Sequence, residues 1–276
     1  MKYLIVLIAI LSLSCTTPKK EKAQPKKVLK LMTFNILGGR NTDGKRDLKR
    51  VADVINKFKP DFVSLQEVDV KTNRIRKVDI PKELAKLTGM HAAFGEAMPY
   101  DGGSYGEAVL SKYPITKSVN HKLPAEKGAE PRAALEVQAN VPGIGKVVFI
   151  GTHFDHLRYD KNRMMQVKKV MELFKNSKGH HFLTGDLNAR PDSKAMKELY
   201  KLYADTWSGK GNGFTIPVTN KRARIDYILV HKNDAKNWKV TKSLTADQLT
   251  DDKKWQDLLK VASDHLAVYV ELEKVK

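Results

Sequence analysis

The chain has 276 residues, of which 41% are hydrophobic and 29% are charged, a balance that excludes an intrinsically disordered polyelectrolyte. Its single cysteine excludes an internal disulfide and any zinc or iron–sulfur site built from several thiolates. Lys and Arg number 50 against 31 Asp and Glu, and the resulting formal charge of +19 favours an anionic substrate or partner.

The first 15 residues have the pattern of an export signal. A lysine precedes an apolar stretch from Leu4 to Leu11, which is too short to span a membrane as a mature helix. The following run, LSLSC, ends at Cys15 and resembles a bacterial lipoprotein signal, in which the cysteine is acylated after cleavage. The resemblance implies an exported protein of the cell envelope, held to a membrane by a lipid on Cys15. A plain secreted protein is the alternative.

Residues 16–27 contain lysine, proline and glutamine with nothing to bury, which is typical of a solvated tether. Residues 28–276 form one predicted domain, because no repeat and no second linker interrupts them. Without the six lysines and Glu21 of residues 1–27, the domain keeps a charge of +14. Lysine outnumbers arginine 39 to 11, so this charge fits solubility at least as well as a nucleic-acid surface.

Short apolar, β-branched runs alternate with helical patterns along the domain. In chain order, the first half predicts strand Val28–Asn35, helix Arg46–Phe58, strand Asp61–Gln66, helix Pro81–Thr88, and strands His91–Glu96, Ser104–Ser111 and Ile115–Leu123. The second half predicts a hairpin of Ala133–Val141 and Lys146–Thr152, helix Asn162–Lys175, strand His181–Thr184, helix Ser193–Leu202, and strands Ile225–Val230 and Leu266–Leu272. This mixture predicts an α/β architecture with packed sheets and outer helices.

Polar side chains repeatedly stand at the ends of the apolar strands. The six clusters are Asn35, Glu67, His153, Asp186 with Asn188, Asp226, and Asp264 with His265. One carboxylate at a strand end is usually a solvated tip. Six clusters of carboxylate, carboxamide or imidazole predict a convergent site, whose hard oxygen ligands favour Mg²⁺ or Mn²⁺ over zinc.

A series of segments resembles the endonuclease/exonuclease/phosphatase superfamily, which has the DNase I-like fold. The segments are TFNIL, DFVSLQEVD, YGEAVLSKYPI, THFDH, LTGDLNARPDS, RIDYILV and SDHLAV, in the family's order. The resemblance implies a four-layer α/β/β/α sandwich. It also implies a divalent-metal-dependent hydrolase of phosphoester bonds, with substrates such as nucleic acids, inositol phosphates or phospholipids.

The resemblance also implies roles for individual residues at the metal and the attacking water. Glu67 resembles the family's principal metal ligand, Asn35 its neighbour at the metal or phosphate, and Asp264 a residue that reaches the metal or braces the site. Asp186 resembles the catalytic aspartate that polarises water or acts as acid–base. Asn188 resembles its phosphate-orienting, substrate-binding partner.

Two histidines complete the implied catalytic set. Asp226 is expected to orient His265, and His153 is expected to be a second cationic or proton-donating imidazole at the phosphoryl group. Tyr105 matches a tyrosine that contacts the phosphate. Glu107 is expected either to pair with His153 or to be a structural surface glutamate.

Further polar residues receive weaker expectations. Arg132 is expected to project toward the phosphate, whereas Arg163 and Gln166 are expected to be structural. Asp155 either contacts the site or caps its loop. The histidines that match no motif are expected on the surface or in loops: His91, His121, His156, His180, His181 and His231.

The substrate stays open between two classes of phosphoester. The segments DVKTNRIRKVD and FTIPVTNKRARIDY resemble a branch of loosely defined phosphodiesterases, some tied to lipid-anchor or inositol-lipid metabolism, which favours a small or lipid-derived phosphodiester. The alternative is a secreted or surface nuclease acting on DNA, which the +14 charge supports. A non-catalytic surface binding protein on the same fold is a third possibility. No obligate protein partner is inferred.

Overall fold

The computed structural model describes residues 27–209 and 211–275, so Cys15 and the predicted signal and most of the tether lie outside the described residues. The described part of the chain contains no helix that is long and apolar enough to cross a membrane.

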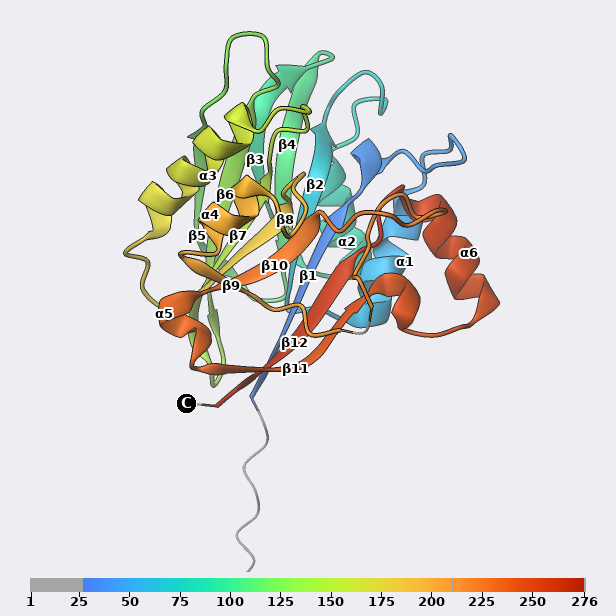
Figure 1. Cartoon of the computed structure of the whole chain (residues 1–276). Coiled ribbons are helices and arrows are strands. Elements are labelled where there is room, and N and C mark those ends of the chain that lie inside the picture. Colours follow the sequence, from blue (N-terminus) through green and yellow to red (C-terminus); the bar gives the residue numbers. More distant parts are fainter. Residues whose placement is uncertain (1–26, 210, 276) are drawn as a thin grey trace, which may run out of the picture.

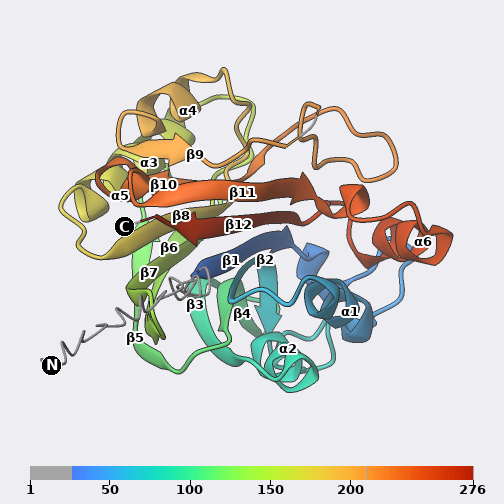
Figure 2. The same cartoon turned by 90° about the horizontal axis from the view of Figure 1, so that it is seen from below.

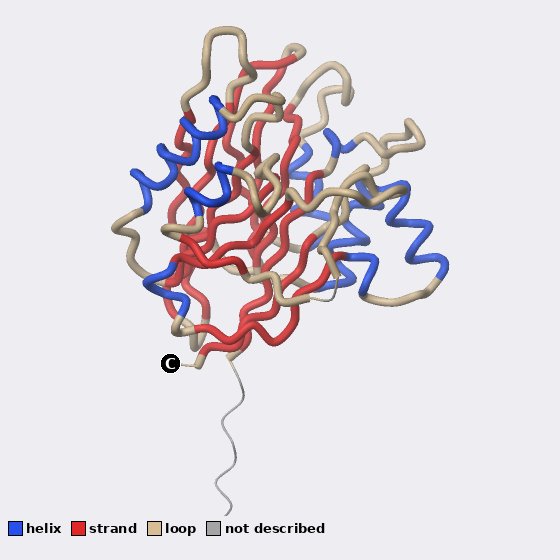
Figure 3. The backbone as a smooth tube through the Cα atoms, in the orientation of Figure 1, coloured by secondary structure: helices blue, strands red, loops and turns tan. Residues whose placement is uncertain are grey.

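Two six-stranded mixed sheets form the centre of the molecule (Figure 3). The first sheet has the order β11-β12-β1-β2-β4-β3, with bounds Trp238–Thr245, Val268–Lys274, Val28–Asn35, Phe62–Val70, Gly103–Ser111 and His91–Tyr100. The second has the order β5-β6-β7-β8-β10-β9, with bounds Ile115–Leu123, Arg132–Val141, Gly145–His153, His180–Asp186, Asp226–His231 and Tyr203–Asp205.

Helices cover the outer face of each sheet (Figures 1 and 2). The first sheet is covered by α1, α2 and α6, with bounds Leu48–Phe58, Ile80–Thr88 and Lys253–Ala262. The second is covered by α3 and α4, with bounds Lys161–Phe174 and Lys194–Leu199. The short helices are α5, η1 and η2, with bounds Lys232–Ala235, Leu37–Gly39 and Ala246–Gln248. The predicted four-layer α/β/β/α sandwich is confirmed.

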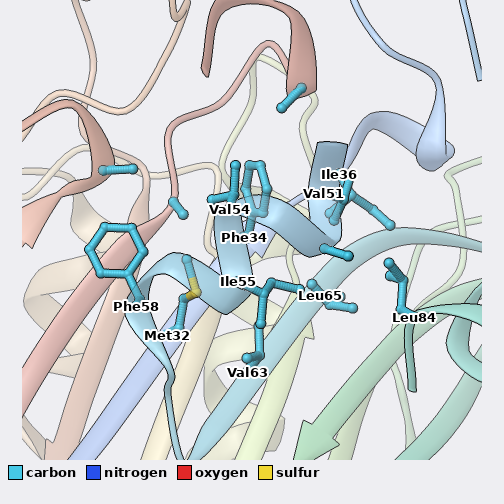
Figure 4. Close-up of a cluster of buried hydrophobic side chains, with 14 of the residues drawn as sticks. Met32, Phe34, Ile36, Val51, Val54, Ile55, Phe58, Val63, Leu65 and Leu84 are labelled. Atoms are coloured by element: carbon cyan, nitrogen blue, oxygen red, sulfur yellow. The ribbon is translucent and has the colours of Figure 1, made fainter. Parts of the chain in front are cut away.

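Three buried apolar clusters fill the spaces between the four layers. Successive residues of β1 point to opposite faces, so Leu31 enters the cluster between the sheets while Met32 enters the cluster under α1 and α6 (Figure 4). Val167 of α3 belongs to the third cluster, over the second sheet. Among the described residues, every buried member of the three clusters lies between Leu29 and Leu272.

The sheet pairings bring the predicted strand-end residues to one edge. β1 and β2 pair in parallel, and so do β7 and β8. Within each pair the carboxyl ends of the two strands therefore lie at the same edge. His153 pairs in register with Asp186, and Asp226 at the start of antiparallel β10 also faces Asp186. The loop before β12 carries His265 to this edge, where Ser263 Oγ donates a 2.7 Å hydrogen bond to the Asn35 carbonyl.

Several elements differ from the sequence-based prediction. The predicted helix Ser193–Leu202 ends at Leu199, after which hydrogen-bonded turns lead the chain into β9. The last strand starts at Val268 because Leu266 and Ala267 still belong to the connection from α6. Sequence analysis missed β9, β11, α5 and α6 altogether.

Candidate active site

A pocket of about 410 Å³ opens at the edge where the strand ends converge. Eight of the predicted site residues line it: Glu67, Tyr105, Arg132, His153, Asp186, Asn188, Asp264 and His265. Asn35, Glu107 and Asp226 are buried and do not line it, although Asn35 and Asp226 contact residues that do. The structure therefore brings the residues of all six strand-end clusters into one region.

A β-bulge presents Glu67 to the pocket. The register between β2 and β4 shifts between Leu65 and Val68, and Glu67 has a φ of 56°. A left-handed backbone is unfavourable for glutamate, and such strain typically persists where a side chain must be aimed at a functional site. The bulge is thus a local signature of function at Glu67.

Asn35 bridges two carboxylates beneath the pocket. Its Nδ2 donates to Glu67 Oε1 and to Asp186 Oδ2, both at 3.1 Å, while its Oδ1 accepts the Leu37 N–H at 3.1 Å. In this arrangement Asn35 orients the two carboxylates and presents its amide nitrogen, not its oxygen, to them. The expected role of Asn35 at the metal or the phosphate stays a prediction.

Asp226, His265 and Asp186 form a chain of charged groups. His265 Nδ1 lies 3.0 Å from Asp226 Oδ2, and His265 Nε2 lies 3.7 Å from Asp186 Oδ2. Burial opposes the charge on His265, but the neighbouring carboxylate of Asp226, followed by that of Asp186, raises its pKa to about 10. His265 is therefore a cation at neutral pH.

Of these three charged groups, Asp186 is the one suited to act as a base. Burial, followed by repulsion from Asp226, raises its pKa to about 7, against the attraction of His265 and a 2.9 Å hydrogen bond from the Asn188 N–H. A carboxylate with a pKa near neutrality suits proton transfer from a bound water. The geometry is consistent with the acid–base role expected of Asp186.

His153 has a different environment from His265. Arg132 Nη1 donates to His153 Nδ1 at 2.9 Å, and Asn188 Nδ2 lies 2.9 Å from His153 Nε2 while donating to the Phe154 carbonyl at 3.0 Å. Burial, then the positive charges of Arg132 and His265, hold the pKa of His153 well below its usual range. A doubly protonated ring would face N–H groups at both nitrogens, so of the two expected forms of His153, cationic or proton-donating, the cation is disfavoured.

Glu107 lies below the site without pairing with His153. The nitrogen of His153 expected to face Glu107 is contacted by Arg132 instead. Among the described residues, neither carboxylate oxygen of Glu107 has a hydrogen-bond partner. Burial raises the pKa of Glu107 well above its usual range, against the attraction of Arg132. Glu107 is buried, which excludes the alternative of a surface glutamate.

One wall of the pocket was missed by the sequence analysis. Arg74 makes a two-pronged ion pair with buried Asp69, with Nε and Nη2 at 2.6 and 2.7 Å, and its guanidinium lies 4.6 Å from the Tyr100 ring centre. Opposite, His156 Nδ1 lies 3.2 Å from Arg132 Nη2. The available signal for Arg74 was the DVKTNR segment, in which Asp69, Thr72 and Arg74 form one hydrogen-bonded unit.

The segment after β7 is braced from α3. Gln166 Oε1 accepts the Asp155 N–H at 2.8 Å, and Arg163 Nη1 donates to the Asp155 carbonyl at 2.8 Å. Asp155 Oδ1 accepts the Leu157 N–H at 2.9 Å. Arg163 and Gln166 are structural, as expected, and Asp155 caps its loop.

Two histidines expected on the surface are buried. His181 Nε2 accepts a 2.9 Å hydrogen bond from the Tyr203 hydroxyl, and the His231 ring stands 5.4 Å from that of His181. They belong to the space between the second sheet and α3, where alternation along β8 and β10 turns them inward. Sequence analysis was wrong about both because neither matched a motif.

The donor chemistry of the site fits a divalent cation. Among the described residues, Asp186, Asp226 and His265 have ligand-type atoms within 4.8 Å of one another. His265 is already protonated and hydrogen-bonded, so it is a poor ligand, whereas Glu67 and Asp264 present carboxylates to the same pocket.

Comparison with known proteins gives one family and several structural neighbours. The Endonuclease/Exonuclease/phosphatase family matches residues 32–265. Protein cwh43 of Schizosaccharomyces pombe is 26% identical over 129 residues, which cover 46% of this chain and only 13% of that protein, so the chain matches about an eighth of its length.

Two solved structures illustrate the likeness in fold. An endonuclease/exonuclease/phosphatase from Beutenbergia cavernae has a TM-score of 0.69 at 24% identity, over 90% of this chain and 72% of that one. A mannosyl-6-phosphatase from Bacteroides thetaiotaomicron has a TM-score of 0.68 at 18% identity, over 88% of this chain and 99% of that one. At these identities the likeness concerns the fold.

Proposed function

Since this chain belongs to the endonuclease/exonuclease/phosphatase family, we propose that it is an Mg²⁺- or Mn²⁺-dependent hydrolase of a small or lipid-derived phosphodiester outside the cytoplasm. Members of the family are phosphoester hydrolases and typically depend on a divalent metal, and this chain is such a hydrolase. The observation that carries the proposal is the convergence of Glu67, Asp186 and His265 on one pocket.

The carboxylates of Glu67 and Asp264, which both line the pocket, are the residues that would hold the cation. When bound, the ion acts as a Lewis acid that neutralises charge on a phosphate oxygen. Asn35 keeps the Glu67 and Asp186 carboxylates apart and oriented through its two hydrogen bonds.

The chain's own residues supply the proton chemistry. Asp186, with its pKa of about 7, accepts a proton from the attacking water, and the Asn188 side chain orients that water or the phosphate. His265, held by Asp226, places a positive charge where negative charge develops on the phosphoryl group. His153 contributes a hydrogen bond as a neutral imidazole, because burial, followed by the charge of Arg132, lowers its pKa.

The shape and walls of the pocket support a small substrate over a duplex. Arg74, Tyr100, Tyr105 and His156 stand around the site and enclose a volume suited to a head group. The likeness to a mannosyl-6-phosphatase supports the same size of substrate. Action in the cell envelope rests on the lipoprotein-like signal that ends at Cys15.

The test is a metal-dependent assay of residues 27–276 on three substrates: bis-p-nitrophenyl phosphate, a phospholipid panel and plasmid DNA. We expect turnover of the small diester or of lipid that needs Mg²⁺ or Mn²⁺ and disappears in Glu67→Gln. If all three substrates stay intact with either metal, the proposed function is wrong.

The nuclease alternative rests on the +14 charge of residues 28–276, to which the exposed Arg222 contributes, whereas Arg224 is buried. It predicts plasmid cleavage far faster than turnover of the small diester, with binding that weakens steeply as salt rises. Intact plasmid beside cleaved lipid would exclude it.

A further inference from the structure

Large apolar side chains are exposed at few places on the described surface. Five such side chains stand out: Val78, Tyr100, Leu157, Tyr159 and Val275. Tyr100 ends β3 and lines the candidate active site, and Val78, Leu157 and Tyr159 lie in loops that adjoin lining residues; Tyr159 is 79% exposed. Single exposed apolar residues are ordinary, but a concentration at one site indicates an interaction surface.

The first pair, Val78 and Tyr100, stands on one side of the pocket. Val78 is in the loop between β2 and α2, and Tyr100, at the end of β3, lines the pocket. The Asn73 N–H donates to the Asp101 carbonyl at 2.8 Å, and Lys77 Nζ donates to the Gly102 carbonyl at 2.9 Å. These bonds join the two loops into one projecting unit.

The second pair, Leu157 and Tyr159, stands in the connection from β7 to α3, next to His156 of the pocket lining. Arg163 Nη1 donates to the Leu157 carbonyl at 2.6 Å, which holds the backbone while the side chain points to solvent. Leu157 and Tyr159 are therefore exposed on a loop whose backbone is held in place by Arg163.

Exposed cations accompany both pairs. Lys71 and Arg76 flank Val78, and Arg158 lies between Leu157 and Tyr159. Within residues 27–209 and 211–275, none of the three makes an ion pair with an acidic side chain. Apolar and aromatic side chains next to free cations match the boundary between acyl chains and anionic head groups.

We propose that the mouth of the active site docks on an anionic lipid bilayer, with Val78, Leu157 and Tyr159 entering the interface. Lys71, Arg76 and Arg158 then lie at the level of the head groups. The aliphatic members favour lipid over nucleic acid, because valine and leucine have no flat face for stacking on bases.

The docking surface lies at the opposite end of the sandwich from the start of β1. In Figure 1 the loops after β2 and β7 lie at the upper end of the sandwich, whereas β1 begins and the chain ends at the lower end. Docking is thus a property of the domain itself, measurable without residues 1–26. The docking proposal rests on the proposed function in one respect only, which is that docking would bring a lipid substrate to the pocket.

The experiment is co-sedimentation of residues 27–276 with vesicles of phosphatidylcholine alone or of phosphatidylcholine with phosphatidylglycerol. The test variant is Val78→Ser/Leu157→Ser/Tyr159→Ser, which changes side chains without touching the pocket lining. The matched control is Val275→Ser, which removes an exposed apolar side chain near the C-terminus.

We expect the parent and the control to bind the anionic vesicles, and the triple variant to bind at least about tenfold more weakly. Turnover of soluble bis-p-nitrophenyl phosphate should be equal in all three, which separates docking from the proposed function. Equal vesicle binding by the triple variant, or no binding by the parent, would overturn the proposal. Loss of plasmid binding in the triple variant, with no vesicle binding by the parent, would assign the surface to nucleic acid instead.

Discussion

Asp186 and Asp226 stand directly opposite each other in the antiparallel ladder between β8 and β10. Both are buried, and neither has a lysine or arginine as a hydrogen-bonding partner within the described residues. The His265 ring lies between them and carries the positive charge that balances one of the two carboxylates. The two aspartates therefore have different roles: Asp226 holds His265, whereas burial, followed by repulsion from Asp226, raises the pKa of Asp186 to about 7.

Asp226→Asn tests that division of duties. The substitution keeps the hydrogen bond from Thr215 Oγ1 to the side-chain oxygen but removes the charge that holds the His265 pKa at about 10. Burial then dominates and lowers the pKa of His265, so the alkaline limb of the kcat profile should move to lower pH. We expect kcat at neutral pH to fall by about 10³-fold. An unchanged limb and rate would remove Asp226 from the mechanism.

Glu67→Gly tests whether the strained backbone at the bulge serves catalysis. Glycine accepts a φ of 56° without the penalty that glutamate carries, so the free energy of unfolding should stay equal or rise by up to about 1 kcal/mol. Metal-dependent turnover should fall by at least about 10³-fold, because a carboxylate ligand is lost.

The matched control for Glu67→Gly is Lys59→Gly. Lys59 has a φ of 48° at the end of α1, and its side chain is exposed and outside the pocket. This variant should show a similar change in urea-unfolding free energy with full activity. Glu67→Gly with near-parent turnover would mean that Glu67 does not hold the metal.

The sequence predicted the convergence of the site well, for a simple geometric reason. Asn35, His153 and Asp186 each end a strand, and the two parallel pairings bring strand ends to one edge. The family's motif order then placed Asp226 and His265 at the same edge. Local pattern and topology agree here, so the residues could be found without a structure.

What sequence could not predict depends on contacts between distant segments. The neutral state of His153 follows from its burial and from the charge of Arg132, 21 residues away on the neighbouring strand. Arg74 reaches the pocket only because its loop folds against the turn after β3. Helix α6 was missed although Trp255, Leu259 and Ala262 have helical spacing.

Gly185→Ala tests the close approach that positions Asp186. Gly185 has a φ of 143°, and an added Cβ would lie 1.8 Å from the Thr152 carbonyl oxygen on β7. Because that neighbour is backbone, the sheet itself must move, and we expect a loss of at least about 3 kcal/mol in unfolding free energy with reduced kcat.

The control for this variant is Gly128→Ala. Gly128 has a φ of 86° but nothing within 4 Å of an added Cβ, so urea unfolding should show a loss of only about 1 kcal/mol from backbone strain. If the two glycine variants lost the same free energy, crowding against Thr152 would not explain the requirement for Gly185.

The buried His181 predicts how stability depends on pH. Burial, followed by the charge of His231, lowers the pKa of His181 from 6.5 to about 3. Between these two values the unfolded chain binds a proton at His181 that the folded chain does not bind, so stability falls as pH falls. The His181 contribution to this loss between pH 7 and pH 5 is about 2 kcal/mol.

His181→Gln removes the titration, and the side-chain oxygen of the glutamine can still accept a hydrogen bond from the Tyr203 hydroxyl. Urea-unfolding free energies at the two pH values should therefore differ less for this variant than for the parent, whereas His91→Gln, at an exposed position, should behave like the parent. An equal loss in His181→Gln and the parent would mean that His181 is protonated in the folded protein.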